Sequence, residues 1–385
     1  MATAITLQGK TDKRDNRWVA IARELGPDFA SRAAQHDAED SFVAENYELM
    51  RQRKLFSAAV PAKLGGGGAS HAEICALLRE LAHYDGSTAL AFSMHSHLLA
   101  ALVWRHQHSL TLPAEPLLRR IAAEELVLVS TGGSDWLDGS GVALKEDGGY
   151  RVSGRKVFSS GAPSGHLLLT TAVYDDPEGG PTVLHFAVNL KGEGVTILDD
   201  WRTLGMRGTG SDSVILDGVY VPEAGVSVRR PKGKWHRFFD VITPLVWPLV
   251  TSVYVGVAEA ARDIALSQAA KKKDDPLVQE LVGEMDTELL MAQSALQSMI
   301  ELAATDYEPN LHNSNLTYQY KTLAVRGAIR TVEKAMEVVG GSSFFRSLGL
   351  ERCFRDIQAA RFHPFQERRQ YVFSGRAVLG LDPVE

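Results

Sequence analysis

Residues 126–222 form a long stretch with the pattern of β-strands, and long helical patterns flank it on both sides. Apolar or alternating runs such as Leu167–Val173 and Val214–Val221 are separated by clusters of Gly, Pro and Asp. Short strands spaced by turns are typical of a small barrel or sandwich, and not of a parallel sheet with helical crossovers. The order helical, strand-like, helical therefore limits the chain to a multidomain α+β fold.

These patterns divide the chain into three parts. We expect an N-terminal α-helical domain over residues 1–125, a central β-barrel or sandwich domain over 126–232 and a C-terminal helical bundle over 233–385. Apolar periodicity in the last part predicts four long helices, at 241–271, 277–306, 315–340 and 350–378. Four such helices are typical of a four-helix bundle.

Composition excludes several classes of partner. The formal net charge is −6, and Lys271–Lys273 is followed by two aspartates, so we expect no nucleic-acid surface. The two cysteines, Cys75 and Cys353, are typical of a reducing compartment, and we expect a cytoplasmic protein. The most apolar run, 241–257, contains two prolines and is shorter than the ~20 residues of a membrane span. We therefore predict no membrane partner. We also predict no metal site.

Two strings of small residues, Ser130–Asp135 and Phe158–Ala162, follow strand-like runs and should lie at strand ends. Small hydroxyl residues at strand ends bring backbone N–H and side-chain O–H groups close to a ligand. A flat ring with polar edges, such as a flavin, is bound in this way, with one face on the strands and the other open to substrate. The strings therefore indicate a candidate flavin site.

Longer strings resemble those of the acyl-CoA dehydrogenase superfamily and occur in its order. They are Val60-Pro61 before the glycines 65–68, Gly148–Lys156 (G-x-Y-x-x-x-G-x-K), Leu204–Ser211 with Val219–Pro222 (L-G-x-R-x-[ST]…V-x-V-P), and Gly340-Gly341 with Glu351–Asp356 (G-G…E-x-x-x-R-D). The resemblance covers essentially the whole chain. It implies that superfamily's fold and a bound flavin.

The resemblance also implies roles for individual residues. Thr131 and Ser134 would lie beside the flavin, Phe158 would pack on its ring, Ser159 would belong to the same cofactor site, and the Ser160 hydroxyl would bond its reactive edge. Gly340 and Gly341 would approach the adenine or pyrophosphate of FAD from a neighbouring subunit. A site shared in this way makes a homotetramer or homodimer the expected assembly.

The chain departs from the family at the catalytic base. A dehydrogenase of this family needs a carboxylate to remove the α-proton of an acyl thioester. In most members it lies eight residues after the Asp that aligns with Asp356, where this chain has Pro364. In a second group it lies at the position of Val246, followed by an arginine that is Trp247 here. The family's R-x-x-F-G string is also missing, and its glutamine is Glu337, so FMN stays open beside FAD.

Histidine and serine stand where the carboxylate is missing. The string from Phe158 to Gly161 resembles the F-x-S-G of the two-component flavin monooxygenases, His363 adjoins Pro364, and His95 lies on an apolar helix expected to face the flavin. Such groups in a dry pocket suit oxygen chemistry, which needs proton donors. We predict Ser160, His363 and His95 as catalytic, and His97 as structural.

Three alternative functions are consistent with the resemblance and with these departures from it. The first, which we favour, is a monooxygenase that acts on a small molecule with O2 and with reduced flavin from a partner reductase. The second is an acyl-CoA dehydrogenase with a displaced base, His363 or Glu367, that passes electrons to an electron-transfer flavoprotein. The third is a flavoprotein subunit without catalysis. The preference rests on the missing carboxylates.

Overall fold

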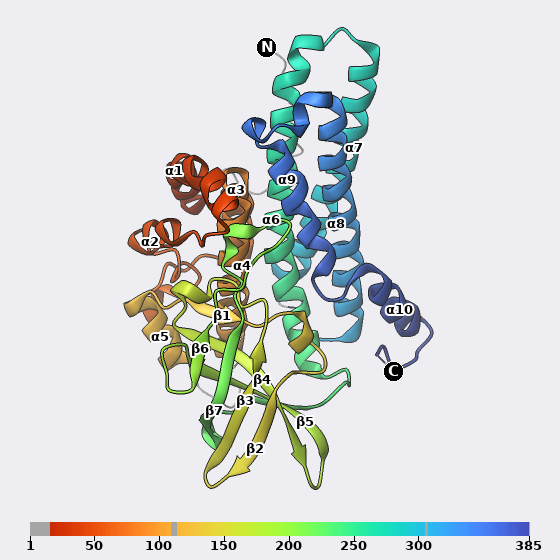
Figure 1. Cartoon of the computed structure of the whole chain (residues 1–385). Coiled ribbons are helices and arrows are strands. Elements are labelled where there is room, and N and C mark those ends of the chain that lie inside the picture. Colours follow the sequence, from red (N-terminus) through yellow and green to blue (C-terminus); the bar gives the residue numbers. More distant parts are fainter. Residues whose placement is uncertain (1–15, 109–113, 305–306, 385) are drawn as a thin grey trace.

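The computed structural model describes residues 16–108, 114–304 and 307–384. Helices come first, a sheet follows, and long helices end the chain (Figure 1). This order confirms the predicted fold class. The predicted domain boundaries at 125/126 and 232/233 fall between helix α5 and strand β1 and between strand β8 and helix α6.

The N-terminal part contains five helices among its described residues. They are α1 (Arg17–Glu39), α2 (Ala44–Gln52), α3 (His71–Tyr84), α4 (Gly86–Gln107) and α5 (Glu115–Glu124). Helix α1 runs through Pro27 without a break and ends at its C-cap Asp40, whose backbone is left-handed. Helix α4 is capped by the Asp85 carboxylate, which accepts from the N–H groups of Ser87 and Thr88.

The central part is one eight-stranded sheet. Its strands are β1 (Leu128–Ser130), β2 (Val142–Glu146), β3 (Gly149–Lys156), β4 (Leu167–Asp176), β5 (Gly180–Asn189), β6 (Val195–Ile197), β7 (Val214–Pro222) and β8 (Val228–Pro231). The order is β6-β7-β3-β2-β4-β5-β8, and β1 pairs with β4 in parallel. Alternating apolar residues such as Tyr150 and Val152 build its buried face. Strand β8 was not predicted.

The C-terminal part packs three long helices with two shorter ones (Figure 1). They are α6 (Arg237–Ala269), α7 (Pro276–Ala304), α8 (Leu311–Val339), α9 (Leu350–Ile357) and α10 (Glu367–Val378). The helix predicted over 350–378 is broken after a 3-10 turn, Gln358–Phe362, because Pro364 lacks an N–H and keeps His363 extended. The break separates His363 from both helices.

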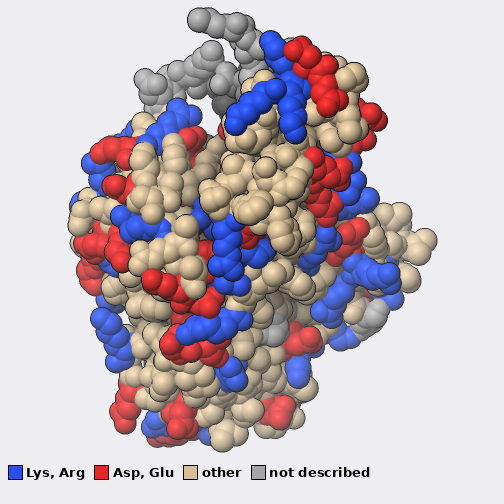
Figure 2. Space-filling view, turned by 45° about the horizontal axis from the view of Figure 1, so that its top comes forward, with Lys and Arg blue, Asp and Glu red and all other residues tan. Residues whose placement is uncertain are grey.

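Helix α6 and its 3-10 extension, Arg237–Lys272, are long and apolar enough to cross a membrane, but 94% of the most apolar window is buried inside the fold. The helix therefore packs as a core element. On the face seen in Figure 2, acidic and basic side chains are interspersed over the surface.

Candidate active site

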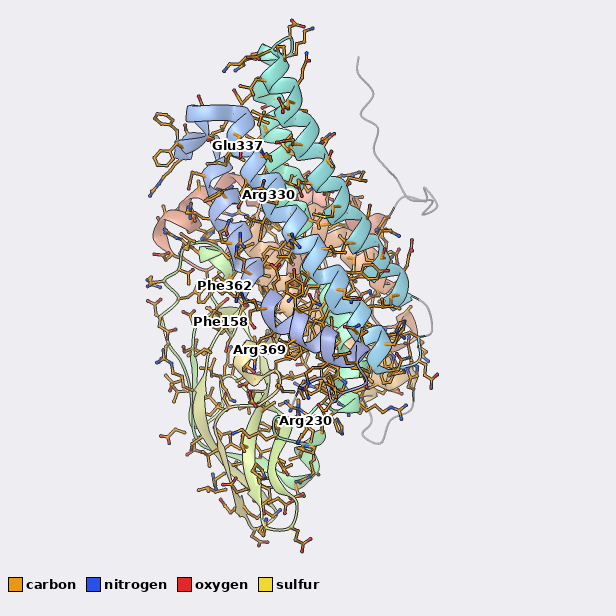
Figure 3. All side chains as sticks on the ribbon, turned by 90° about the vertical axis from the view of Figure 1, so that its right-hand side faces the viewer. Phe158, Arg230, Arg330, Glu337, Phe362 and Arg369 are labelled. Atoms are coloured by element: carbon orange, nitrogen blue, oxygen red, sulfur yellow. The ribbon has the colours of Figure 1, made fainter. Side chains whose placement is uncertain are left out.

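The two strings of small residues lie side by side. The Gly132 N–H donates to the Val157 carbonyl at 2.9 Å. A Cβ on Gly132 would lie 2.7 Å from the Phe158 Cβ, and one on Gly133 would lie 3.1 Å from Pro364 Cδ. Glycine is thus needed for this close approach. The turn after β1, the end of β3 and the break before α10 meet here, and Phe158 and Phe362 mark the junction in Figure 3.

A buried lysine holds the turn after β1. The Lys156 Nζ donates to the Asp135 carboxylate at 3.1 Å and to the carbonyls of Ser140 and Thr171, both at 2.6 Å. Burial lowers the pKa of Lys156, and the Asp135 charge opposes that shift. The Thr131 hydroxyl donates to the same carboxylate at 2.6 Å. The Thr131 hydroxyl is therefore turned into this network, and its predicted place beside a flavin stays a prediction.

A second buried cation supports the same turn. The Arg230 guanidinium donates to the carbonyls of Trp136, at 2.9 Å, and Leu137, and to the His185 ring. Burial lowers the pKa of Arg230 to about 10. Strand β8 supplies this arginine, so the strand that sequence reasoning missed fixes the turn. The side chain of Ser134 lies outside the described residues.

Trp136, in the same turn, joins the sheet to the helical bundle. Its indole N–H donates to the Tyr318 hydroxyl at 3.0 Å. Its ring lies 5.4 Å from that of Trp247 and 5.7 Å from that of Phe239, measured between centroids. The aromatic cluster behind the turn is therefore continuous from the sheet to α6 and α8.

Phe158 presents an aromatic face at the junction. Its φ is +56°, which is unusual for a bulky residue, and its side chain is 52% exposed beside the Trp201 ring. Ser159 is fully buried, and its hydroxyl has no partner among the described residues. A half-exposed ring beside a glycine cradle fits a flat heterocycle, so the residues present fit a flavin.

Ser160 heads a chain of hydroxyl groups. Its Oγ lies 2.7 Å from that of Ser211, which lies 2.7 Å from Thr209 Oγ1, and Thr209 donates to the Met206 carbonyl at 2.9 Å. The Thr209 proton is donated to the Met206 carbonyl, so Thr209 can only accept from Ser211. Ser211 in turn can only accept from Ser160. The Ser160 proton is thus used by Ser211, and its free lone pairs make it an acceptor toward a ligand.

The helical side presents His363, bonded at Nε2 to the Tyr254 hydroxyl at 2.6 Å. Burial raises the pKa of Tyr254 well above 10 and lowers the pKa of His363 to about 3. Tyr254 therefore keeps its proton and donates it to Nε2, which leaves the proton of the neutral ring on Nδ1. No described residue bonds Nδ1, so His363 offers an N–H donor.

Lys321 holds the turn that carries His363. Its Nζ donates to the carbonyls of His363 and Phe365, each at 2.8 Å, and lies 4.5 Å from the Trp247 ring centroid. Burial lowers the pKa of Lys321 to about 7. One buried amine thus fixes the chain on both sides of Pro364.

His97 is a further histidine of helix α4. Burial lowers the pKa of His97 to about 4, so its ring is neutral near pH 7. Its Nδ1 lies 3.3 Å from the Ser93 carbonyl, so Nε2 is left as an acceptor. Sequence reasoning treated His97 as structural and missed Tyr254 and Lys321, although each is a polar residue inside an apolar stretch.

His95 has a different environment. Its Nδ1 accepts from the Leu128 N–H at 3.0 Å, and its Nε2 donates to the Phe56 carbonyl at 2.8 Å. It is 1% exposed, and burial lowers its pKa to about 4. Both ring nitrogens bond backbone groups, so the geometry favours a structural tie between α4 and β1 instead of the predicted catalytic role.

Comparison with known protein families gives three matches in chain order. Residues 20–108 match the acyl-CoA dehydrogenase N-terminal domain, 130–219 its middle domain and 249–368 its C-terminal domain. The chain belongs to the acyl-CoA dehydrogenase family. It is a flavin-dependent oxidoreductase, which confirms the predicted enzyme class.

Named relatives within this family differ in chemistry. The putative acyl-CoA dehydrogenase YdbM of Bacillus subtilis is 28% identical, with 91% of this chain and 93% of YdbM covered. The amino sugar nitrososynthase DnmZ of Streptomyces peucetius is 31% identical over 92% and 91%. SfnC of Pseudomonas putida, described as a probable FMNH2-dependent monooxygenase, is 28% identical over 90% of each chain. Flavin monooxygenases are thus among the relatives of this chain.

A solved structure extends the likeness to three dimensions. KijD3, solved in complex with FMN and a dTDP-amino-keto sugar, superimposes with a TM-score of 0.85 at 28% identity, covering 94% of both chains. Its likeness runs through all three parts of this fold.

Positions that carry the base in acyl-CoA dehydrogenases hold no carboxylate here. Pro364 lies against Gly133, and Val246 and Trp247 are buried. The Asp356 charge adds to the effect of burial in raising the pKa of Tyr254. The Asp356 carboxyl itself accepts from the Met206 N–H at 2.5 Å, and burial raises the pKa of Asp356 to about 7. Among the described residues, no carboxylate hydrogen-bonds His363.

Other family positions lie farther out. Glu367 is on the surface, where it accepts from Tyr371 at 2.5 Å and lies 4.0 Å from Arg326, so it is not at the junction. Gly340 and Gly341 are exposed at the end of α8, before the exposed Phe344. Their predicted contact with a flavin requires a second subunit and stays a prediction.

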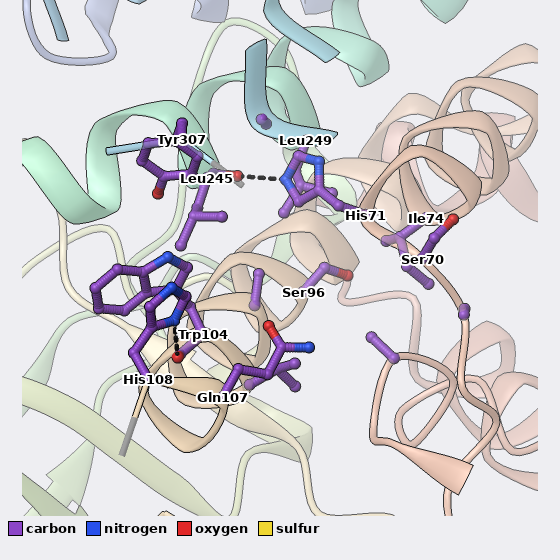
Figure 4. A pocket seen from close by; sticks show the side chains of 15 residues that line it. Ser70, His71, Ile74, Ser96, Trp104, Gln107, His108, Leu245, Leu249 and Tyr307 are labelled. Atoms are coloured by element: carbon purple, nitrogen blue, oxygen red, sulfur yellow. Dashed lines mark hydrogen bonds between the residues drawn. The ribbon is translucent and has the colours of Figure 1, made fainter. Parts of the chain in front are cut away.

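A cavity of about 380 Å³ lies between α3, α4 and α6 (Figure 4). Leu245 and Leu249 line it from α6, where the His71 ring bonds the Leu245 carbonyl at 2.8 Å. Residues two apart on a helix point about 200° apart, so Trp247, which contacts His363, faces the other way. The cavity and the candidate active site are therefore on opposite faces of α6.

Proposed function

We propose that this protein is a flavin-dependent monooxygenase that inserts one atom of O2 into a small organic substrate. Reduced flavin, when bound, supplies the two electrons with which the second oxygen atom leaves as water. The observation that carries the proposal is the exchange at the base position: Pro364 replaces a carboxylate, and neutral His363 stands beside it. Without a carboxylate, removal of a carbon-bound proton lacks its usual base.

The hydroxyl chain supports a site for reduced flavin. Ser160 presents an acceptor, because its proton bonds Ser211. Reduced flavin carries an N–H on its central ring where oxidised flavin carries a bare nitrogen. An acceptor at that edge therefore favours the reduced form. We propose FMN over FAD, since the relative SfnC is described as FMNH2-dependent and KijD3 was solved with FMN.

Neutral histidines suit the proton steps of oxygen chemistry. His363 presents its Nδ1–H, held by the bond from Tyr254, and His97 presents an acceptor nitrogen. A donor that is already oriented stabilises developing negative charge on oxygen without reorganisation. Trp247, 2% exposed beside His363, keeps water from this side. The chain's own groups therefore provide an oriented N–H donor, shielded from water on the Trp247 side.

A monooxygenase of this kind needs a partner reductase to deliver reduced flavin, and we propose that one serves this protein. We also propose a homodimer or homotetramer in the cytoplasm. The exposed aromatic rings of Phe344, 86% exposed, and Phe345, 68% exposed, follow Gly340-Gly341 and support an interface at this end of α8.

The test mixes the protein, loaded anaerobically with reduced FMN, with O2 in a stopped-flow spectrometer. A monooxygenase should give a transient absorbance that differs from both reduced and oxidised flavin. With isotopically labelled O2, the product should carry one labelled atom. Direct return to the oxidised spectrum, with no labelled product from a panel of sulfur, nitrogen and aromatic substrates, would contradict the proposal.

The second candidate is an acyl-CoA dehydrogenase, favoured by the likeness to YdbM. Its base would have to be His363, whose Nε2 is taken by Tyr254, because Glu367 lies at the surface. Anaerobic addition of acyl-CoA to the oxidised flavoprotein separates the two functions. Bleaching of the flavin would establish the dehydrogenase, whereas a monooxygenase should keep its oxidised spectrum.

A further inference from the structure

A groove of about 800 Å³ runs between α7, α8 and the segment from Ala360 to Arg368. Figure 3 faces this side of the molecule and labels Arg330 on α8. The groove adjoins the back of the turn that carries His363, because Lys321 and Phe365 line it. It is separate from the junction where the strand ends meet Pro364.

The groove is rich in positive charge, although the chain as a whole is acidic. Its cationic lining residues are Lys321, Arg326, Arg330, Arg361 and Arg368, against the carboxylates of Glu288 and Glu367. Glu333, outside the lining, pairs with Arg330 at 2.7 Å and reaches Arg361 only at 3.9 Å. Arg368 pairs with no carboxylate among the described residues. The groove therefore keeps an excess of positive charge.

Two further features favour an anion over bulk water. Lys321, on the groove's inner side, is only 5% exposed, so its charge is poorly hydrated. Helix α10 begins here at Glu367, and the side chain of its N-cap residue, Gln366, makes no capping bond. The N–H groups of the first turn are thus open to an acceptor, and guanidinium groups bind phosphate with paired N–H donors.

We propose that this groove binds a phosphate group or a comparable dianion through Arg326, Arg330 and Arg368. A dianion offsets the excess charge and gives an acceptor to Arg368, which pairs with no carboxylate among the described residues. Arg326 and Arg330 lie beside it and keep their pairs with Glu367, at 4.0 Å, and Glu333, at 2.7 Å. The phosphate has two possible sources, the phosphate of a flavin and that of a separate phosphorylated small molecule. Because Lys321 lines the groove and bonds the carbonyls of His363 and Phe365, an anion here also stabilises the turn behind the active site. The inference does not depend on the proposed oxygenase activity.

Isothermal titration of the full chain with inorganic phosphate and with pyrophosphate, at low salt, tests the proposal. We expect saturable binding, weakened about tenfold by Arg330→Gln or Arg368→Gln, since each removes charge-assisted hydrogen bonds. The control is Arg119→Gln on α5, an exposed arginine paired with Glu115, which should bind as the wild type does. Equal thermal unfolding of all variants excludes misfolding. The proposal fails if wild type binds neither probe saturably, or if both groove variants match the control.

Flavin titrations then separate the two sources. A flavin phosphate in the groove predicts that Arg368→Gln weakens binding of FMN but leaves binding of riboflavin unchanged. A separate phosphorylated ligand predicts that both flavins bind the variant as they bind the wild type, while affinity for inorganic phosphate falls.

Discussion

The two sides of the candidate active site are built on different electrostatic principles. On the strand side, two buried cations, Lys156 and Arg230, hold the turn after β1 by bonds to a carboxylate and to backbone carbonyls. On the helical side one buried amine, Lys321, also holds the turn, but the reactive positions are neutral, and His363 and Tyr254 share one hydrogen bond. Buried charge therefore fixes shape where the ring would rest, while neutral groups with a free donor stand where protons would move.

The largest expected effect is on the strand side. Lys156→Met leaves the Asp135 carboxylate buried without its cation, and we expect the free energy of unfolding to fall by about 3–5 kcal/mol. Urea unfolding measures this. The control is Lys145→Met, whose exposed pair with Glu223 should contribute less than about 1 kcal/mol. Equal losses of unfolding free energy in both variants would show that the buried Lys156–Asp135 pair contributes no more than the exposed Lys145–Glu223 pair.

On the helical side, the effect should fall on chemistry and not on folding. His363→Ala should lower the rate of product formation at least about a hundredfold, since a positioned proton donor is lost. Flavin affinity and unfolding should change little. His312→Ala, an exposed histidine on α8, serves as the control. Tyr254→Phe should lower the rate less. The His363 ring remains, but its proton is no longer held on Nδ1 by the bond from Tyr254. An unchanged rate in His363→Ala would remove this residue from the mechanism.

The comparison also predicts a pH dependence of stability. His95 has a pKa of about 4 in the folded chain against an ordinary value of 6.5. Between these values the unfolded chain binds the extra proton, so stability falls as pH drops from 6.5 toward 4, by ~1.4 kcal/mol per pH unit for one such group. Asp356, with its raised pKa, acts in the opposite sense. The difference between wild type and His95→Gln isolates His95, and urea midpoints at several pH values measure it.

The smallest expected effect concerns the hydroxyl chain. In Ser211→Ala the Ser160 hydroxyl loses the group to which it donates, so it can donate to oxidised flavin as well. The preference for reduced over oxidised FMN should shrink by roughly fivefold, the size of one neutral hydrogen bond. Flavin fluorescence and anaerobic titration give the two affinities. Ser227→Ala, in the loop before β8, where the hydroxyl donates to the His185 carbonyl and not to this chain of hydroxyls, is the control.

Much of the fold could be predicted from the sequence, because strands and helices depend on the local pattern of apolar and polar residues. The strands and long helices follow from apolar periodicity, and the meeting of the two small-residue strings follows from their places at strand ends. Strand β8 escaped because Val228–Pro231 is short and carries two arginines, one of them buried for a structural reason. The break before α10 was missed because periodicity continues across Pro364.

The site was only partly predictable, because a side chain's role depends on which face of a helix it occupies. His95 and His97 are two residues apart, yet the first bonds β1 and the loop before α3, and the second bonds only the Ser93 carbonyl of its own helix among the described residues. No spacing rule distinguishes them. Tyr254 and Lys321 come from different helices and gain meaning only when both meet the His363 turn.

The indole of Trp136 limits how the molecule can move. Its ring is inserted among Phe239 and Trp247, and its N–H bonds Tyr318, while its backbone belongs to the turn after β1. Swinging the sheet away from the bundle as a rigid body would pull this ring out of close-packed aromatic contacts. Substrate entry should therefore proceed by rotamer changes of side chains at the rim, such as Phe158 and Phe362, and not by hinge opening of whole domains.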